Sequence, residues 1–168
     1  MINADEIYIR GDDMDWNAIK ETLYEEDGSL RDIVADTDEM TLEKWKLLCA
    51  FLQKSYDLHV FCDGKEIDER FEYSLVKKAF LDENHFYYVS FNICRIPFHL
   101  YLSFGEQHLD GNEHLEFDFF PHEVDDLDKH NAILDFMMQL ANVLQISIRM
   151  TYENCHDKYL LKVEPTTV

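Results

Sequence analysis

The feature that most constrains this fold is a change of hydrophobic period between residues 121 and 152. Between Ile133 and Leu144, apolar residues recur every three or four positions, which places them along one side of an α-helix. These residues are Ile133, Phe136, Met137, Leu140, Ala141 and Leu144. Apolar and polar residues then alternate, the pattern of a strand with one buried face, at Ile146, Ile148, Met150 and Tyr152. A helix that must bury one side and leads into such a strand requires a sheet on which to pack.

The segments upstream supply this sheet and further helices. A first helix is predicted from an N-cap at Asp13, and it ends before Gly28, which suits the left-handed residue that follows a helix. Thr41 is predicted to cap a second helix. The other expected elements are a turn at 63–64, a weaker helix at 71–82, and strands at 30–34, 58–62, 87–93, 98–104 and 115–119. The strand, helix, strand order between residues 29 and 62 favours a right-handed crossover that joins parallel strands.

These elements predict an α+β fold. We expect a single domain over residues 1–168, with a mixed, mainly antiparallel sheet of about five to seven strands and helices packed mainly on one face. A chain of 168 residues that is 46% hydrophobic suits one core of this kind. Residues 1–12 are expected to form a frayed N-terminal arm or an edge strand, and residues 165–168 a frayed C-terminus.

Charge is distributed unevenly along the chain. It has 35 Asp and Glu residues against 15 Lys and Arg residues, a formal net charge of −20. Residues 1–45 hold 14 acidic and 4 basic side chains, and residues 105–128 hold 9 acidic and no basic ones. Such a field repels nucleic acid and anionic lipid and attracts basic surfaces, so we expect a basic protein partner, no nucleic acid and no membrane. Solubility, or adaptation to a salty cytoplasm, would explain the same charge without a partner.

Two acidic patches are the candidate binding residues, because no neighbouring Lys or Arg offsets most of them. The first comprises Asp12, Asp13, Asp15, Glu25, Glu26 and Asp27, and the second comprises Glu123, Asp125, Asp126 and Asp128. Several of these residues crowd expected helix starts, where the helix macrodipole favours negative charge. Helix-terminus electrostatics is therefore a second explanation of the same residues.

One strand presents a polar face that could carry chemistry. His114, Glu116 and Asp118 alternate with apolar residues and therefore point the same way, and His99 and Tyr101 would face the same side from a neighbouring strand. Imidazole and carboxylate groups that converge on one face could bind a divalent metal or act as acid and base. A solvated polar face is the commoner cause of such alternation.

Several common chemistries are absent from the sequence. It has no Gly-x-Ser-x-Gly nucleophile motif, no Gly-rich phosphate loop and no recognised metal motif, so we expect no cofactor and no metal, and we favour a non-enzymatic protein. The four cysteines form no Cys-x-x-Cys motif and fit reduced thiols in a cytosol. One of them, Cys155, is adjacent to His156. No apolar run reaches the ~18 residues that span a bilayer, and the acidic N-terminus does not look like a secretory signal. We therefore expect a cytoplasmic protein.

The chain resembles a family of small, acidic, uncharacterised bacterial proteins over residues 14–163. The resemblance rests on residues 26–33 (Glu-Asp-Gly-Ser-Leu-Arg-Asp-Ile) after a helix that contains Trp16, and on Trp45 in the next helix. It rests also on Glu116-Phe117-Asp118 with Pro121 and Glu123, and on Tyr152-Glu153-Asn154. The Phe119-Phe120 pair and the weak helix near residue 75 depart from the family pattern. The resemblance implies a shared fold and no established activity. Its acidic character is similar to that of immunity proteins that neutralise polymorphic bacterial toxins.

The leading hypothesis is therefore a non-enzymatic acidic binding protein that docks a basic protein partner, with toxin immunity as its most concrete version. One alternative is a small enzyme or metal-binding protein that uses the face of His114, Glu116 and Asp118. The other is an interaction subunit with no chemistry of its own.

Overall fold

The predicted helix-to-strand switch is present in the computed structural model, which describes residues 15–35, 40–102, 115–155 and 158–166. Helix α4, Leu127–Leu144, begins at the N-cap Asp126, whose carboxylate accepts a hydrogen bond from the backbone N–H of Lys129 (2.8 Å). Its apolar stripe is buried, and strand β7, Ile148–Tyr152, follows it. The prediction fails only at Tyr152, which stands at the end of the strand and is 36% exposed.

Within the described residues, eight strands form one open sheet in the order β3-β2-β4-β5-β6-β1-β7-β8. Each pair of neighbouring strands is antiparallel. The strands not yet given are β1 Arg31–Ala35, β2 His59–Cys62, β3 Lys65–Ile67, β4 Tyr87–Ile93, β5 Ile96–Tyr101, β6 Glu116–Phe119 and β8 Tyr159–Val163. The α+β class and the mainly antiparallel sheet are confirmed. The sheet has eight strands instead of about five to seven, and no parallel pair occurs among the described strands, so the mixed character was wrong.

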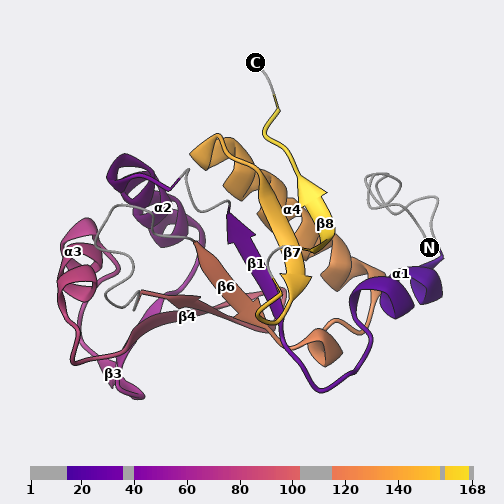
Figure 1. The fold of residues 1–168 in the computed structure, drawn as a ribbon, viewed down its shortest axis with the longest axis horizontal. Helices are drawn as coiled ribbons and strands as arrows, with labels where there is room; N and C mark the ends of the chain where they lie inside the picture. Colours follow the sequence, from indigo (N-terminus) through magenta and orange to yellow (C-terminus); the bar gives the residue numbers. More distant parts are fainter. Residues whose placement is uncertain (1–14, 36–39, 103–114, 156–157, 167–168) are drawn as a thin grey trace.

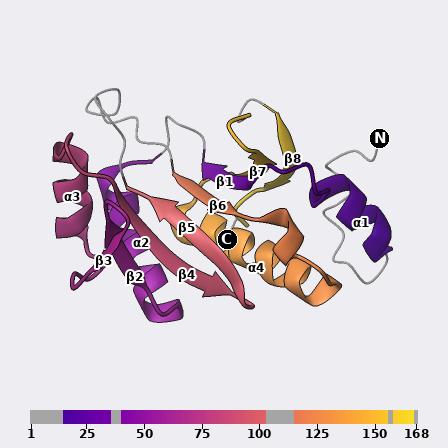
Figure 2. The ribbon, with the colours of Figure 1, turned by 90° about the horizontal axis from the view of Figure 1, so that it is seen from below.

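The predicted parallel crossover is also wrong. Helix α2, Leu42–Ser55, does connect β1 to β2, but β4, β5 and β6 lie between these two strands in the sheet. The three intervening strands come later in the chain and pair with one another in sequence order, as the labels of Figure 2 allow the reader to follow; Figure 1 shows the same sheet from another side. The order of β1, α2 and β2 could not reveal how many later strands enter the space between them.

Two short strands were not predicted. β3 has only three residues, of which Lys65 and Glu66 are exposed, so it lacks the apolar alternation of a strand. It pairs with β2 through the predicted turn at Asp63 and Gly64, where φ is 50° and 81°, both in the left-handed region that a tight hairpin turn requires. At the other edge, β8 pairs with β7.

The first helix begins and ends at positions that differ from the prediction. α1, Trp16–Leu23, has Asp15 as its N-cap, and Asp13 lies outside the described residues. The helix ends before Tyr24, because Tyr24 leaves the helical conformation (φ −123°) and buries its ring. Gly28 has φ 81° but lies in the following loop, so its predicted role at the helix end is wrong. The other two predicted helices are present as α2, with Thr41 as its N-cap, and α3, Tyr73–Leu81.

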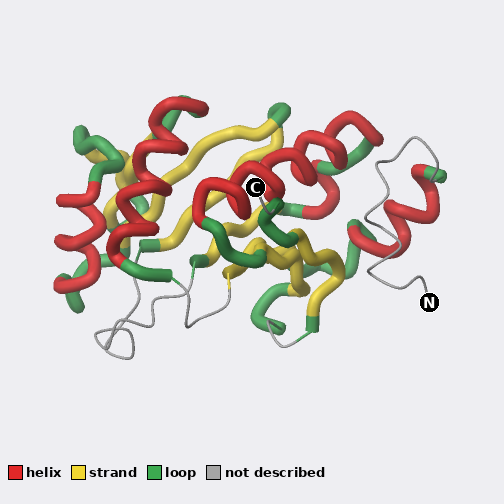
Figure 3. Tube along the Cα trace, turned by 90° about the horizontal axis from the view of Figure 1, so that it is seen from above, coloured by secondary structure: helices red, strands yellow, loops and turns green. Residues whose placement is uncertain are grey.

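The core lies between the sheet and the helices α2 and α4. Phe136, in the middle of α4, is 1% exposed, and its ring centroid lies within 6.4 Å of several other ring centroids. These rings belong to Phe51, Tyr56, Phe91, Phe98 and Phe117. Figures 2 and 3, drawn from opposite sides, show α2 and α4 on the same face of the sheet. The opposite face of the sheet is where the polar residues predicted on β5 and β6 lie.

Candidate functional site

The two predicted acidic patches adjoin at one end of the molecule. The loop that follows α1 lies beside the 3-10 turn η3, Pro121–Glu123, and the start of α4 (Figure 1). A hollow of about 530 Å³ is lined from both segments, by Glu26, Gly28, Ser29, Phe120, Pro121 and His122. We call this region the acidic end; its carboxylates are Asp15, Glu25, Glu26, Asp27, Glu123, Asp125, Asp126 and Asp128. Asp12 and Asp13 lie outside the described residues.

Some carboxylates of the acidic end have local structural roles. Asp15 and Asp126 cap α1 and α4, as the macrodipole explanation anticipated. Asp27 accepts hydrogen bonds from the hydroxyl of Ser29 (2.7 Å) and its backbone N–H (3.0 Å), and these bonds lower the pKa of Asp27 to about 2. Asp125 forms an ion pair with Lys129 (2.9 Å).

Other carboxylates have no such role. Glu25, Glu26 and Asp128 are exposed and make no ion pair with any residue that the structure describes. Phe120 stands in the same hollow and is 47% exposed. The acidic end therefore combines uncompensated negative charge with an exposed aromatic side chain.

A buried arginine holds the acidic loop in place. Arg31, at the start of β1, is fully buried; its Nε donates to the carbonyl of Leu23 (2.7 Å) and its Nη2 donates to the carbonyl of Glu25 (2.8 Å). Its Nη1 donates to Ser29 Oγ (3.1 Å) and lies 3.4 Å from Asp27 Oδ1. The planar, five-donor guanidinium can satisfy carbonyls at the end of a helix and several loop acceptors at once. Arg31 therefore fixes the whole loop between α1 and β1.

Two of the segments on which the family resemblance rests, 26–33 and 152–154, meet at this loop. The guanidinium of Arg31 stacks over the ring of Tyr152, with Cζ 4.7 Å from the ring centroid. The backbone N–H of Leu30 donates to Glu153 (3.1 Å), and the backbone N–H of Asn154 donates to Asp32 (3.0 Å). Segments 26–33 and 152–154 are therefore explained by mutual support of one loop, without any chemistry.

A buried tyrosine and histidine join α1 to α4. The hydroxyl of Tyr24 lies 2.7 Å from Nδ1 of His130, and both side chains are buried. Burial lowers the pKa of His130 to about 4 and raises the pKa of Tyr24, so both groups are neutral at pH 7. The two neutral groups therefore share one buried hydrogen bond. Sequence periodicity missed this pair, because a histidine at a helix position gives no signal of its partner.

The predicted polar face on β5 and β6 is only partly a solvated face. Asp118 is 4% exposed; its Oδ1 lies 3.1 Å from Nδ1 of His99, and its Oδ2 accepts a hydrogen bond from the Tyr101 hydroxyl (2.5 Å). Burial and the bond to Asp118 raise the pKa of Tyr101. Glu116 is half-buried, and His114 lies outside the described residues.

The structure adds one unpredicted carboxylate to this face. Asp32 is buried and stands directly opposite Asp118 across β1 and β6. An imidazole oriented by a buried carboxylate is an arrangement that can serve acid–base chemistry. A structural role explains the same contacts. His99 and Tyr101 engage both oxygens of Asp118, and a buried carboxylate needs such hydrogen-bond partners in a folded protein.

A cluster with metal-ligating side chains lies away from both regions. Cys62, Asp63 and His85 each offer one ligand atom, and these atoms lie within 4.8 Å of one another. Sequence spacing missed the cluster, because His85 reaches it from a different segment.

Comparison with protein-family models, with curated proteins and with solved structures finds no match to this chain. No helix in the described part of the chain has the length and hydrophobicity that a membrane crossing requires.

Proposed function

We propose that this protein is a non-enzymatic acidic binding protein whose acidic end docks a basic protein partner. The observation that carries the proposal is that segments 26–29 and 120–122, which adjoin the two acidic patches and lie far apart in the sequence, line one hollow. Helix capping explains Asp15 and Asp126, but Glu25, Glu26 and Asp128 make no ion pair with a described residue and add exposed negative charge to this end. Such a surface steers a basic partner toward it and raises the association rate.

Two further features support a docking surface. The loop that carries Glu25 and Glu26 is fixed by buried Arg31, so little conformational entropy is lost when a partner binds. Phe120 offers exposed aromatic area within a charged rim, the arrangement in which a few residues supply most of the binding energy. The most concrete version of the proposal is an immunity protein that covers a basic surface of a toxin, in a bacterial cytoplasm.

The test begins with capture of partners from native lysate on immobilised protein, followed by association kinetics with the captured protein. We expect a basic partner whose association slows as salt rises, since the Debye length falls from ~30 Å at 0.01 M to ~10 Å at 0.1 M. We expect dissociation to change much less. Replacing Glu25 and Glu26 by Gln should lower the association rate, and Phe120→Ala should mainly raise the dissociation rate.

A matched control removes two carboxylates elsewhere. Asp68→Asn with Glu83→Gln makes the same change in net charge at exposed positions near β3 and α3. This control should leave the association rate close to that of the native protein. An acidic partner, or equal effects of the two double variants, would contradict the proposal and leave the charge with a role in solubility.

A further inference from the structure

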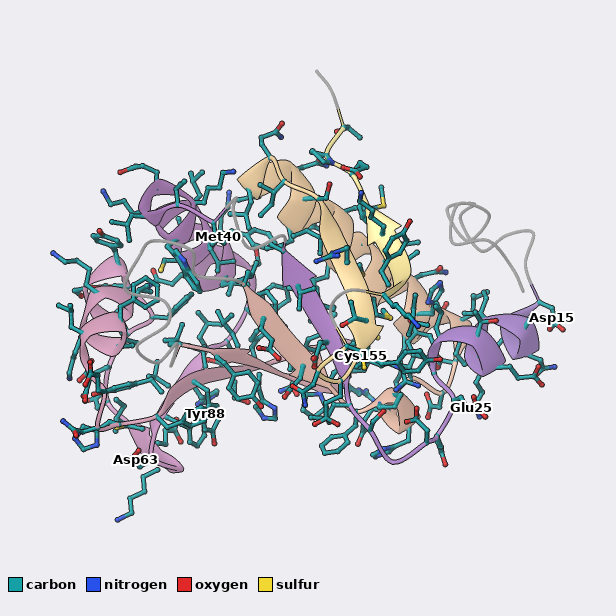
Figure 4. All side chains as sticks on the ribbon, in the orientation of Figure 1. Asp15, Glu25, Met40, Asp63, Tyr88 and Cys155 are labelled. Atoms are coloured by element: carbon teal, nitrogen blue, oxygen red, sulfur yellow. The ribbon has the colours of Figure 1, made fainter. Side chains whose placement is uncertain are left out.

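We propose that Cys62, Asp63 and His85 form a zinc-binding site. The cluster lies where the β2–β3 turn meets the segment before β4, at the end of the molecule opposite the acidic end; Figure 4 labels Asp63 there. This site replaces the expectation, drawn from the absence of sequence motifs, that the protein binds no metal. It does not depend on the proposed binding function.

The donor types select the metal. A thiolate, an imidazole and a carboxylate together suit Zn²⁺, whereas Mg²⁺ and Ca²⁺ prefer oxygen ligands alone. Zinc bonds of about 2.0–2.3 Å in a tetrahedral site separate neighbouring ligand atoms by roughly 3.3–3.8 Å. The three donors already lie within 4.8 Å of one another, so side-chain rotation is enough to close the site. Three protein ligands leave a fourth position for water or another donor.

The backbone prepares Asp63 for a metal. Its N–H donates to the carbonyl of Phe86 (2.8 Å), and its Oδ1 accepts the N–H of Phe86 (2.8 Å). These two bonds tie the turn to the segment that carries His85. The second carboxylate oxygen, Oδ2, lies 2.7 Å from Nδ1 of His85. Zn²⁺ would therefore replace the proton shared by a carboxylate and an imidazole that are already held together.

The surrounding charges favour a cation. Asp82 accepts a hydrogen bond from the Tyr87 hydroxyl (3.2 Å), and its charge acts on His85. Lys78 is a nearby cation, but Glu69 engages its ammonium group (2.8 Å). The thiol of Cys62 and the carboxylate of Asp63 thus lie beside His85, and the charge of Asp82 adds to the negative field there.

The experiment uses the full chain, stripped with a chelator and titrated with Zn²⁺ and, separately, with Co²⁺. We expect one equivalent of Zn²⁺ to bind, and we expect bound Co²⁺ to show thiolate-to-metal charge-transfer absorption. Loss of a group that only orients a metal ligand weakens binding by about 10–100-fold. Cys62→Ser, Asp63→Asn and His85→Gln should each weaken binding at least that much, and Cys62→Ser should also abolish the charge-transfer band. The Asp63→Asn change keeps the turn intact, because asparagine tolerates positive φ and retains an acceptor for the N–H of Phe86.

Three controls isolate the site. Cys94→Ser and Cys155→Ser remove exposed thiols elsewhere, and His59→Gln removes an exposed histidine that contacts two carboxylates, Asp57 and Glu66. These variants should bind Zn²⁺ as the native protein does.

Affinity should fall as the pH drops through the pKa of His85, which its hydrogen bond to Asp63 raises, because protons compete with the metal. No binding by the native chain, or native affinity in Cys62→Ser or His85→Gln with the fold intact by circular dichroism, would overturn the proposal.

Discussion

The two ends of this molecule balance their charges in different ways. At the end formed by α2, α3 and β3, residues 41–82 carry eight acidic and seven basic side chains, and many of them pair locally. Examples are Lys46 with Glu43 (3.0 Å) and Lys78 with Glu69 (2.8 Å). At the acidic end, Glu25, Glu26 and Asp128 make no such pair among the described residues. Figure 4 shows Asp15 and Glu25 at this end and Asp63 at the other.

The difference separates charge that serves the fold from charge that is available to a partner. Exposed local pairs contribute little to stability, typically about 0–1 kcal/mol, and leave little field beyond the surface. The acidic end instead places a fully buried cation, Arg31, beneath the loop and leaves carboxylates above it exposed. The loop at this end is therefore held by the buried arginine and not by the exposed carboxylates, whose charge is free to act on other molecules.

The largest expected effect tests whether the two ends form one cooperative unit. Phe136→Ala should lower the free energy of unfolding by about 3–5 kcal/mol, because it opens a cavity beneath five other rings. That is a large share of a typical ~5–15 kcal/mol. Trp16 lies in α1 at the acidic end and Trp45 in α2 at the other end. Within each protein, native or Phe136→Ala, tryptophan fluorescence and far-UV circular dichroism should give the same denaturant midpoint. Two distinct midpoints in one protein would show that parts of the molecule unfold separately.

Arg31 gives the next largest effect. Arg31→Met should cost about 2–4 kcal/mol, because the carbonyls of Leu23 and Glu25 lose their donor in a buried setting. Lys46→Met, which breaks an exposed pair at the other end, should cost less than about 1 kcal/mol. Urea denaturation of both variants makes the comparison. Equal costs would refute the distinction drawn between buried and surface charge.

The histidines of the two ends should respond to pH with opposite signs. Burial lowers the pKa of His130 to about 4, so below pH 6.5 the unfolded chain takes up a proton that the folded chain does not. As pH falls from 6.5 to 4, native stability should drop by up to about 3 kcal/mol relative to His130→Gln. Above pH 6.5 the difference should be constant. Unfolding curves measured across this range would check the slope.

His59 provides the opposite case. Hydrogen bonds to Glu66 and Asp57 raise the pKa of His59, so its contribution to stability is fully present below pH 6.5 and is lost as pH rises through the folded value. The stability difference between the native protein and His59→Gln should therefore shrink with rising pH. A difference that grows with pH would contradict the assignment.

The smallest effect concerns the exposed acids themselves. Replacing Glu25 and Glu26 by Gln should change the free energy of unfolding by no more than about 0.5 kcal/mol, since neither carboxylate has a structural partner among the described residues. Asp126→Ala, which removes a helix N-cap at the same end, should cost about 1 kcal/mol. Thermal melts of both variants would separate carboxylates that support the fold from those that do not.

The sequence was most informative where one period governs a whole element. The stripe of α4, the N-cap of α2 and the alternation in β4 were all readable, because local geometry alone decides them. Strand β3 was not, since its three residues are held by pairing rather than by burial. The order of strands was also hidden, because it depends on contacts between distant segments.

The candidate sites show the same division. The sequence predicted two acidic patches, but it did not predict that the segments beside them, 26–29 and 120–122, line one hollow. Asp118 was expected on a solvated face, and the structure buries it beneath the hydrogen bonds of His99 and Tyr101. Asp32 and His130 carried no signal of their partners, since those contacts join segments far apart in the chain. The hydrogen bonds of Arg31 are local, but an arginine at a strand start gives no sign that it will be buried.

The position of β1 in the sheet sets an order of events during synthesis. β1 is the first strand made among the described residues, yet its register partners are in β6, where Arg31 faces Phe119, and in β7, where Arg31 faces Tyr152. The ribosome must therefore release most of the chain before β1 can be enclosed. Pairings between such distant segments form slowly, because the intervening loop must close before any contact compensates its lost entropy. Until then Arg31 cannot be enclosed by β6 and β7. The acidic segment before β1 is therefore synthesised well before the core on which it packs.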